Sequence, residues 1–284
     1  MNRKIKSNLL IVFFLLVGLV SCISPFICTF FYDLYSTHVI IDYEARELNY
    51  HKITQESLHK KSEIRFGLLD FQKNLITNRK THSQKDKITF EEGDMLGYIT
   101  IPRIDSLIPI YEGKTDAILQ KGVGHLKQDT KKTCLPFLGK NKNCVLAGHS
   151  GLSSARLFSD LDKLSIDDVF YIRVRSKYFE YKVIEISINT PDKAEEYLQI
   201  EKGKDICTLV TCTPVPLNSH RLLVKGERIK YDGLFNRANL KERQINQNTV
   251  SFFVCIGIVL FLFILLFLVR RKGKRKWKKE NARF

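Results

Sequence analysis

Two long apolar runs stand near the ends of this 284-residue chain. Residues 9–31 form a run of 23 residues without a charged side chain, and residues 250–269 form a second of 20, most of them Phe, Leu, Ile and Val. A helix rises about 1.5 Å per residue, so either run is long enough to cross a hydrocarbon core of about 30 Å. The pattern therefore predicts two transmembrane helices.

An alternative stays open for the first run. Leu19, Val20 and Ser21 precede Cys22 as in a lipoprotein signal, in which the chain is cleaved and lipidated at the cysteine. Residues 23–32 remain apolar and aromatic, whereas a mature lipoprotein turns polar quickly. An uncleaved membrane anchor is therefore favoured over lipidation at Cys22.

The polar pattern divides what lies between the apolar runs. Residues 32–93 are charged and poor in Pro and Gly, which favours a helical arm with the character of a lid. From residue 97 the chain alternates short β-rich runs with turns, at residues 97–101, 107–111, 144–149, 169–174, 178–188, 205–212 and 222–229. Short helices are expected at residues 116–120 and 153–164.

Seven strands with few helices predict a mainly β fold, a closed or nearly closed β-barrel. The expected organisation is a cytoplasmic flank and first span at 1–31, the arm at 32–93, the barrel at 94–230, a polar tether at 231–249, the second span at 250–269 and a basic tail at 270–284.

The charge distribution orients the two predicted spans. The chain has 46 Lys and Arg residues against 30 Asp and Glu, a formal net charge of +16. Residues 270–284 hold nine Lys and Arg and one Glu, and residues 1–8 hold three basic residues. Because basic flanks mark the cytoplasmic side, we expect a two-pass protein of the cell membrane, in contact with membrane lipid, with both termini cytoplasmic and the barrel extracellular. The remaining positive charge is too small and dispersed to indicate a nucleic-acid partner.

Four of the seven cysteines lie between the predicted spans, at positions 134, 144, 207 and 212. Cys134 and Cys144 flank a loop and are candidates for a disulfide in an exported domain. Cys144 and Cys207 stand in apolar strand-like runs, so buried free thiols are an equally good interpretation. The sequence leaves this choice open.

Chemistry is most plausible where polar side chains follow apolar strands. Cys212 ends one strand, next to prolines that prevent the strand from continuing, and Arg221 opens the next strand after a loop of eight residues. A guanidinium near a thiol favours the thiolate or holds an oxyanion. His149 ends another apolar strand and is preferred over His125 and His220 as the partner of Cys212. Taken singly, a cysteine in such a position is more often structural, and an arginine there is more often a surface residue paired with a nearby carboxylate.

Together these segments resemble the sortase family. The resemblance covers about residues 97–229 and rests on six runs in family order: LGYITIP at 96–102, GVGHL at 122–126, AGHSG at 147–151, LFSDL at 157–161, TLVTC at 208–212 and NSHRLLV at 218–224. The second apolar run, the polar arm and the HRLLV segment resemble class C, the pilus-assembling sortases of Gram-positive bacteria.

The resemblance implies a sortase-type barrel with His149, Cys212 and Arg221 as the catalytic set and with neither a cofactor nor a metal. Class C sortases carry an Asp-Pro-aromatic lid in the arm. The nearest match here is Asp70-Phe71, which lacks the Pro, so these two residues are either a lid over the site or ordinary helix residues.

The family implies a cysteine transpeptidase that cleaves LPXTG-type sorting signals of surface proteins through a thioester acyl-enzyme. In a pilus-assembling enzyme, the acyl group passes to a lysine amine of another pilin subunit. The alternatives are a sortase that anchors surface proteins to peptidoglycan, a surface cysteine protease and a non-catalytic membrane-tethered binding barrel.

Overall fold

The computed structural model describes residues 27–50, 90–126 and 139–233, together with scattered helical residues at 17–18, 21, 24–25, 52–53, 55, 250, 253–254, 257 and 261. The chain divides into two compact units, Met1–Leu234 and Phe235–Phe284. All the strands of the described part belong to the first unit.

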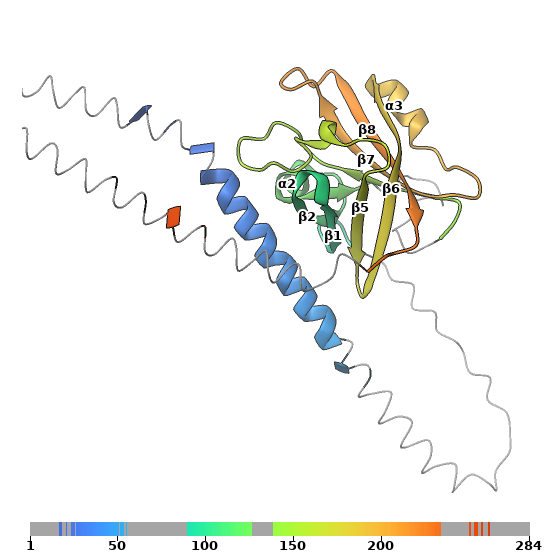
Figure 1. The fold of residues 1–284 in the computed structure, drawn as a ribbon, viewed down its shortest axis with the longest axis horizontal. Coiled ribbons are helices and arrows are strands. Elements are labelled where there is room, and N and C mark those ends of the chain that lie inside the picture. Colours follow the sequence, from blue (N-terminus) through green and yellow to red (C-terminus); the bar gives the residue numbers. More distant parts are fainter. Residues whose placement is uncertain are drawn as a thin grey trace, which may run out of the picture. The chain divides into compact units, whose positions relative to one another are not determined.

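A closed β-barrel is the centre of the first unit (Figure 1). Its strands are β1 (Met95–Ile101), β2 (Ser106–Glu112), β3 (Val123–His125), β4 (Lys142–Ala147), β5 (Val169–Val174), β6 (Lys177–Asn189), β7 (Asp205–Thr213) and β8 (His220–Ile229). Their order around the barrel is β1-β2-β3-β4-β7-β8-β6-β5. The pairs β2/β3 and β4/β7 are parallel and the other pairs are antiparallel. The predicted mainly β, closed-barrel fold is confirmed.

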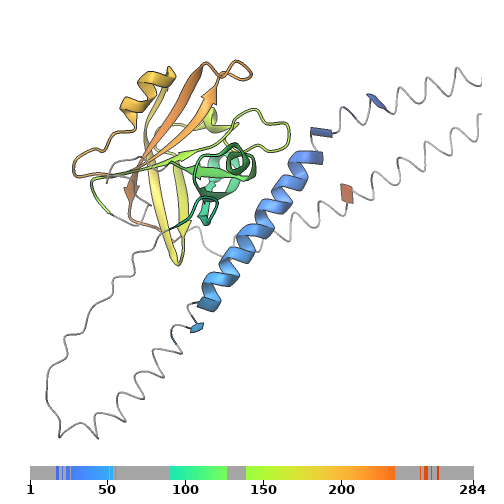
Figure 2. The ribbon, with the colours of Figure 1, turned by 180° about the vertical axis from the view of Figure 1, so that it is seen from behind.

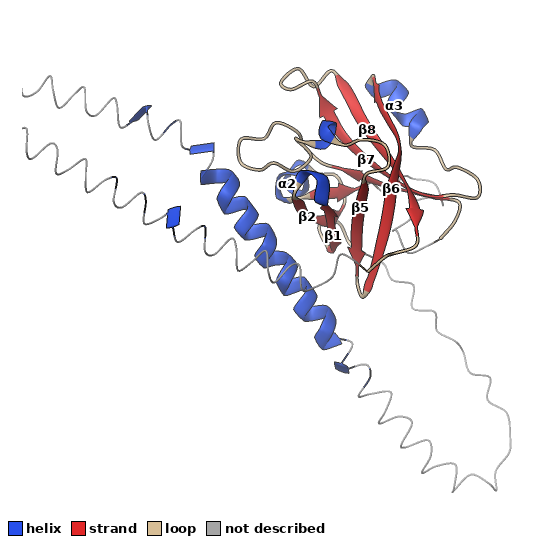
Figure 3. Cartoon of the chain, viewed as in Figure 1, coloured by secondary structure: helices blue, strands red, loops and turns tan. Residues whose placement is uncertain are grey.

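Short helices connect the strands of the barrel. They are the 3₁₀ turns η1 (Pro102–Ile104) and η3 (Leu161–Lys163) and the α-helices α2 (Asp116–Lys121) and α3 (Pro191–Tyr197). Pro191 begins α3, a position where the missing backbone N–H costs no hydrogen bond. In both views α3, drawn in yellow-orange, lies outside the barrel (Figure 2), and strands make up most of the domain around it (Figure 3).

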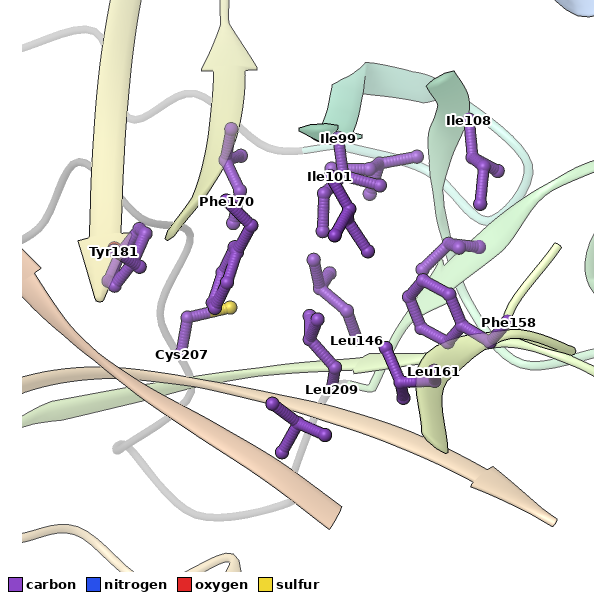
Figure 4. Packing of buried hydrophobic residues seen from close by; sticks show 14 of the residues in the cluster. Ile99, Ile101, Ile108, Leu146, Phe158, Leu161, Phe170, Tyr181, Cys207 and Leu209 are labelled. Atoms are coloured by element: carbon purple, nitrogen blue, oxygen red, sulfur yellow. The ribbon is translucent and has the colours of Figure 1, made fainter. Parts of the chain in front are cut away.

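Strand alternation separates an inner from an outer face of the barrel. The inward side chains form a single apolar core, in which Phe170 and Tyr181 stack with ring centroids 5.4 Å apart (Figure 4). A smaller apolar cluster lies on the outer face beneath α3, where Val145 of β4, Val210 of β7 and Leu223 of β8 meet Ala194. On β4, β7 and β8, residues that lie an even number of positions from Val145, Val210 and Leu223, respectively, are therefore on the outer face, and the residues between them are on the inner face.

A long helix at residues 27–50 is anchored to the barrel by buried polar contacts. Glu44 accepts hydrogen bonds from Nε of Arg173 at 2.8 Å and from the Tyr98 hydroxyl at 3.0 Å. The neighbouring Tyr43 hydroxyl donates to the Leu96 carbonyl and accepts from the Arg175 backbone N–H. This part of the arm is therefore an integral piece of the folded domain.

All seven predicted strands are observed, and so is the predicted helix at 116–120. The strand β3 was missed because three residues are too few to show alternation. The predicted helix at 153–164 is wrong: this segment consists of turns and ends in η3. Leu157 there has a φ of +40°, a left-handed conformation that a continuous α-helix cannot include. The short helix α3 was also missed.

The prediction of two transmembrane helices is contradicted. Among the residues that the structure describes, no helix combines the length and apolar composition needed to cross a membrane. The continuous helix at 27–50 carries five charged residues, three of them at positions 44, 46 and 47. Most of residues 9–31 and 250–269 lie outside the described part of the chain. This finding corrects the predicted two-pass localisation with cytoplasmic termini and an extracellular barrel, whereas contact with membrane lipid stays a prediction.

Candidate active site

The three residues expected to be catalytic lie on or just beyond three neighbouring strands of the barrel, β4, β7 and β8. Cys212 of β7 and Arg221 of β8 are register partners. In the parallel pair β4/β7, Ala147 pairs with Val210, so His149 and Cys212 both lie two residues further along the chain. Because parallel strands end at the same edge of a sheet, this register brings His149 to the rim that carries Cys212 and Arg221.

These three residues also share one face. Val145 and Val210 belong to the outer cluster, and Cys212 has the same parity as Val210 on β7. Arg221 has the parity of Leu223, which is in the outer cluster as well. The candidate site is thus an outer-face rim site above that small cluster, and Cys212 is only half-buried there.

Hydrogen bonds continue the β4/β7 pairing beyond the end of β4. The Gly148 N–H donates to the Val210 carbonyl at 3.0 Å, and Thr211 Oγ1 donates to the Gly148 carbonyl at 2.8 Å. Two residues after Gly148, Ser150 Oγ donates to the carbonyl of Cys212. The backbone on both sides of His149 is therefore tied to the strand that carries Cys212.

Gly148 allows this close approach. A Cβ atom at position 148 would lie 2.8 Å from the Phe158 ring, closer than real Cβ contacts. Phe158 is fully buried in the barrel core, and its N–H donates to the His149 carbonyl at 3.1 Å. The glycine before the histidine is thus required by packing, and the His149 backbone is held from both sides.

The imidazole of His149 contacts a carboxylate that sequence reasoning missed. Its Nε2 lies 3.3 Å from Oδ1 of Asp116, the first residue of α2. Asp116 is held in turn by Gln120, whose Nε2 donates to the second carboxylate oxygen at 2.7 Å. The contact is exposed on the Asp116 side, where 74% of the side chain is accessible. No signal in the sequence links position 116 to position 149, because only the barrel brings α2 near the end of β4.

Arg221 is oriented by backbone carbonyls. Its Nη1 donates to the carbonyls of Asn218 and His220, both at 3.1 Å. In the described part of the chain, no carboxylate forms an ion pair with Arg221, so the alternative of a surface arginine paired with an acid finds no support there. The His220 side chain is hydrogen-bonded to the hydroxyl of the adjacent Ser219.

The loop between β7 and β8 presents apolar side chains beside the site. Val215 and Leu217 are 51% and 76% exposed. Gly151, in a left-handed conformation with a φ of +73°, packs so closely on this loop that a Cβ there would lie 2.5 Å from Val215. The loop after β4 and the loop after β7 therefore meet next to Cys212.

Two further predictions concern the lid and a disulfide. Asp70 and Phe71, the candidate lid, lie outside the described residues. Cys144 is a free thiol, so the considered disulfide to Cys134 is not formed. Within the described ranges, no group of three or more His, Cys, Asp or Glu side chains is arranged to hold a metal ion.

Comparison with known proteins places this barrel in a family. The sequence model of the Sortase domain matches residues 99–229. Sortase A of Bacillus anthracis is 32% identical over 141 residues, which cover 50% of this chain and 63% of that protein. Sortase A of Streptococcus agalactiae is 33% identical over 149 residues, covering 51% and 57%. The chain thus spans less than two thirds of the length of these curated relatives.

Solved structures extend the match. Sortase C1 of Streptococcus suis is 43% identical, with 51% of this chain and 78% of that chain covered and a TM-score of 0.47. Sortase C of Clostridium perfringens is 36% identical, with 68% of this chain and 99% of that chain covered and a TM-score of 0.50. Since the match to that enzyme spans nearly its whole structure and the Sortase domain model covers most of the barrel, this chain belongs to the sortase family.

Proposed function

We propose that this protein is a cysteine transpeptidase in which Cys212 is the nucleophile, His149 the proton carrier and Arg221 the electrostatic stabiliser. The observation that supports this most is the register pair Cys212–Arg221, joined at the same rim by His149. A thiol, an imidazole and a guanidinium at one rim of the barrel are the groups that acyl transfer through a thioester needs.

The proposed reaction has two steps. The Cys212 thiolate attacks the Thr carbonyl of an LPXTG-type sorting signal, and the tetrahedral intermediate breaks its Thr–Gly bond. The Gly amine leaves with a proton from the His149 imidazolium, and a thioester remains on Cys212. An acceptor amine then attacks the thioester, gives its excess proton back to His149 and departs with the acyl group, which regenerates the thiolate. Arg221 faces the charge that develops on the carbonyl oxygen.

The surroundings of Cys212 suit a polypeptide substrate. The thiol lies at a rim rather than in the core, so an extended chain has access to it. The exposed Val215 and Leu217 offer apolar contact to the side chains of the signal. Asp116 holds the Nε2 side of the imidazole, so we assign the exchange of protons with substrate to Nδ1.

For the acceptor, we propose a lysine amine of another pilin subunit. The similarity to sortase C of Clostridium perfringens supports this choice. The second candidate is an amine of the peptidoglycan precursor, and the curated relatives named Sortase A favour it. The two differ only in the acceptor, so a competition between acceptors decides between them.

Intact-mass analysis of the full chain tests the chemistry. Incubation with an LPXTG-type peptide should add the mass of the acyl fragment to the protein, and an added pilin or peptidoglycan-type amine should remove it as an amide. Cys212→Ala should abolish the adduct. Cys207→Ala, which removes a buried thiol from the same strand, is the control and should retain the adduct. If the peptide is released only as a free carboxylate in the presence of amines, the protein is a protease. If no thioester is trapped at all, the barrel is a binding module.

A further inference from the structure

Inside the barrel, away from the candidate site, four strands direct titratable side chains inward. They are Glu112, His125, Cys144 and Cys207. Each lies two residues from a member of the core cluster on its own strand, and these members are, in the same order, Ile110, Val123, Leu146 and Leu209. Strand alternation therefore places all four side chains on the inward face. The four side chains are 6%, 3%, 2% and 0% exposed, in the order Glu112 of β2, His125 of β3, Cys144 of β4 and Cys207 of β7. Their presence in an apolar core calls for an explanation, because buried ionisable groups are costly unless they are paired.

Glu112 and His125 form the first pair. They are register partners in the parallel pair β2/β3, and Nδ1 of His125 lies 2.9 Å from Oε2 of Glu112. The other ring nitrogen, Nε2, is buried and has no hydrogen-bond partner of normal geometry among the described residues. The carboxylate therefore fixes the ring and leaves Nε2 available for a weaker partner inside the barrel.

Cys144 occupies the neighbouring position on the next strand, β4. His125 stands opposite Leu146 in the antiparallel pair β3/β4, which makes Cys144 its diagonal neighbour on the same face, a distance that a long ring spans. The imidazole and the thiol interact, and the interaction affects the titration of both. A carboxylate, an imidazole and a thiol thus follow one another across three neighbouring strands.

Cys207 completes the series. Cys144 and Cys207 are register partners in the parallel pair β4/β7, and both are free thiols. Neighbouring strands lie about 4.7–4.9 Å apart, within the range of about 4.4–6.8 Å between Cα atoms that a disulfide spans. Cys207 stands among Phe170, Tyr181 and Leu209, so the pair is enclosed by apolar side chains (Figure 4).

We propose that Cys144 and Cys207 are a buried dithiol that a peroxide oxidises to a disulfide, with Cys144 as the attacking thiol and His125 as the group that activates it. This site is separate from Cys212: the two thiols face the barrel interior, whereas Cys212 faces outward. The inference therefore stands whether or not the protein is a transpeptidase.

The electrostatics of the cluster support this order of events. The neighbouring Cys207 thiol is the main influence that lowers the pKa of Cys144; burial opposes it, and His125 adds to it. Burial disfavours a charged imidazole, but interactions with Cys144 and Glu112 raise the pKa of His125 to about 10. Burial raises the pKa of Cys207, so Cys144 is the thiol with thiolate character.

The chemistry proceeds in two balanced steps. The Cys144 thiolate attacks one oxygen of hydrogen peroxide, an S–O bond forms, the O–O bond breaks and hydroxide leaves, which gives a sulfenic acid. The sulfur of Cys207 then attacks that of Cys144, an S–S bond forms, the S–O bond breaks, and the hydroxide departs with the Cys207 proton as water. Peroxide is close to water in size, so it can reach the pair through local opening of the barrel.

Peptide mapping of the full chain carrying Cys212→Ala tests the proposal. Accessible thiols are first blocked under native conditions, the protein is treated with hydrogen peroxide, and the remaining thiols are alkylated after denaturation. We expect a cross-linked peptide joining Cys144 and Cys207, two hydrogen atoms lighter than its parts and separated by a reductant. The unsubstituted chain, treated with the same peroxide dose but without prior blocking, should be oxidised at the accessible Cys212, which shows that the dose is sufficient. Full alkylation of both positions at that dose, or oxidation of Cys144 beyond sulfenic acid without a cross-link, would overturn the proposal.

Single variants in the same background test the roles. In Cys207→Ser, which keeps a hydroxyl donor beside Cys144, Cys144 should accumulate as a sulfenic acid that dimedone traps, whereas in Cys144→Ser the remaining Cys207 should stay unmodified. Glu112→Gln should slow the oxidation of Cys144 several-fold, because the imidazole loses its anionic partner. Circular dichroism verifies that each variant keeps the barrel. Equal reactivity of the two thiols in the single variants would contradict the assignment of Cys144 as the attacking thiol.

Discussion

Asp116 and His149 are 33 residues apart in the chain, yet a carboxylate oxygen of Asp116 lies 3.3 Å from Nε2 of His149. The second oxygen of Asp116 accepts a hydrogen bond from Gln120 one turn later on α2. The proposed proton carrier is thus held by a carboxylate that is itself held in place. If the protein is a transpeptidase, Asp116 is a positioning residue, because it acts on the reaction through the imidazole.

Asp116→Asn should lower kcat about two- to five-fold and leave KM unchanged, because an exposed ion pair contributes ~0.2–1 kcal/mol. Asp116→Glu should restore much of the loss. Nitrogen NMR of the His149 ring should show a changed tautomer population in the Asn variant. The matched control is Asp192→Asn, which alters an exposed aspartate in the first turn of α3. An unchanged ring spectrum with unchanged kcat would remove Asp116 from the site.

Gly148→Ala should destabilise the barrel by about 1–3 kcal/mol, the usual cost of an overpacked core, and should also displace His149. The added Cβ would stand 2.8 Å from the buried Phe158 ring. Urea unfolding measures the stability, and acyl-enzyme formation measures the position of the histidine. The double variant Gly148→Ala/Phe158→Leu has room for the methyl group and should recover part of both. If the single variant is as stable as the parent, the packing argument for Gly148 is wrong.

Glu44→Ala should cost about 3–5 kcal/mol of unfolding free energy, because it leaves the Arg173 guanidinium buried without its partner. Nε of Arg173 donates to Glu44 at 2.8 Å, and the two side chains are 8% and 3% exposed. The double variant Glu44→Ala/Arg173→Met should be more stable than Glu44→Ala, since no unpaired charge remains. Glu47→Ala, on the same helix, serves as control. A loss no greater than that of the control would mean that the helix at 27–50 contributes little to the domain.

Glu201 should contribute acid-sensitive stability. Hydrogen bonds from Lys204 and then from Lys225 lower the pKa of Glu201 below its ordinary value of 4.5. A lowered carboxyl pKa stabilises the fold above the unfolded-state value, and that stability is lost as the pH falls through the folded-state value. The difference in unfolding free energy between the parent and Glu201→Gln should therefore be largest near neutral pH, begin to decrease as the pH falls below the ordinary carboxyl value of 4.5, and vanish only below the lowered folded-state pKa. A difference for Glu201→Gln that stays constant over this pH range would refute the assignment.

The sequence by itself determined the barrel and the residues at its rim. Alternating β-branched and aromatic residues mark strands wherever a strand is long enough, so all strands except the three-residue β3 were predictable. Cys212, His149 and Arg221 were recognisable because a polar residue at the end of an apolar strand has few structural reasons to be there. Local sequence also misled: residues 153–164 have a helical pattern, but the contact of Phe158 with the His149 backbone takes precedence over that preference.

Only the tertiary structure decided which distant side chains meet. The contact of Asp116 with His149, the ion pair of Glu44 with Arg173 and the in-register pair Cys144–Cys207 all join different elements. Such contacts depend on strand order and register around the closed barrel, in particular on the parallel pair β4/β7, which brings together segments about sixty residues apart. The pattern of apolar and polar residues shows the two-residue period of each strand, but it does not specify which strand will be its neighbour in the sheet. The residues that are candidates for chemistry could therefore be recognised in the sequence, whereas the contacts of Asp116, Glu44 and Cys144 with distant elements could not.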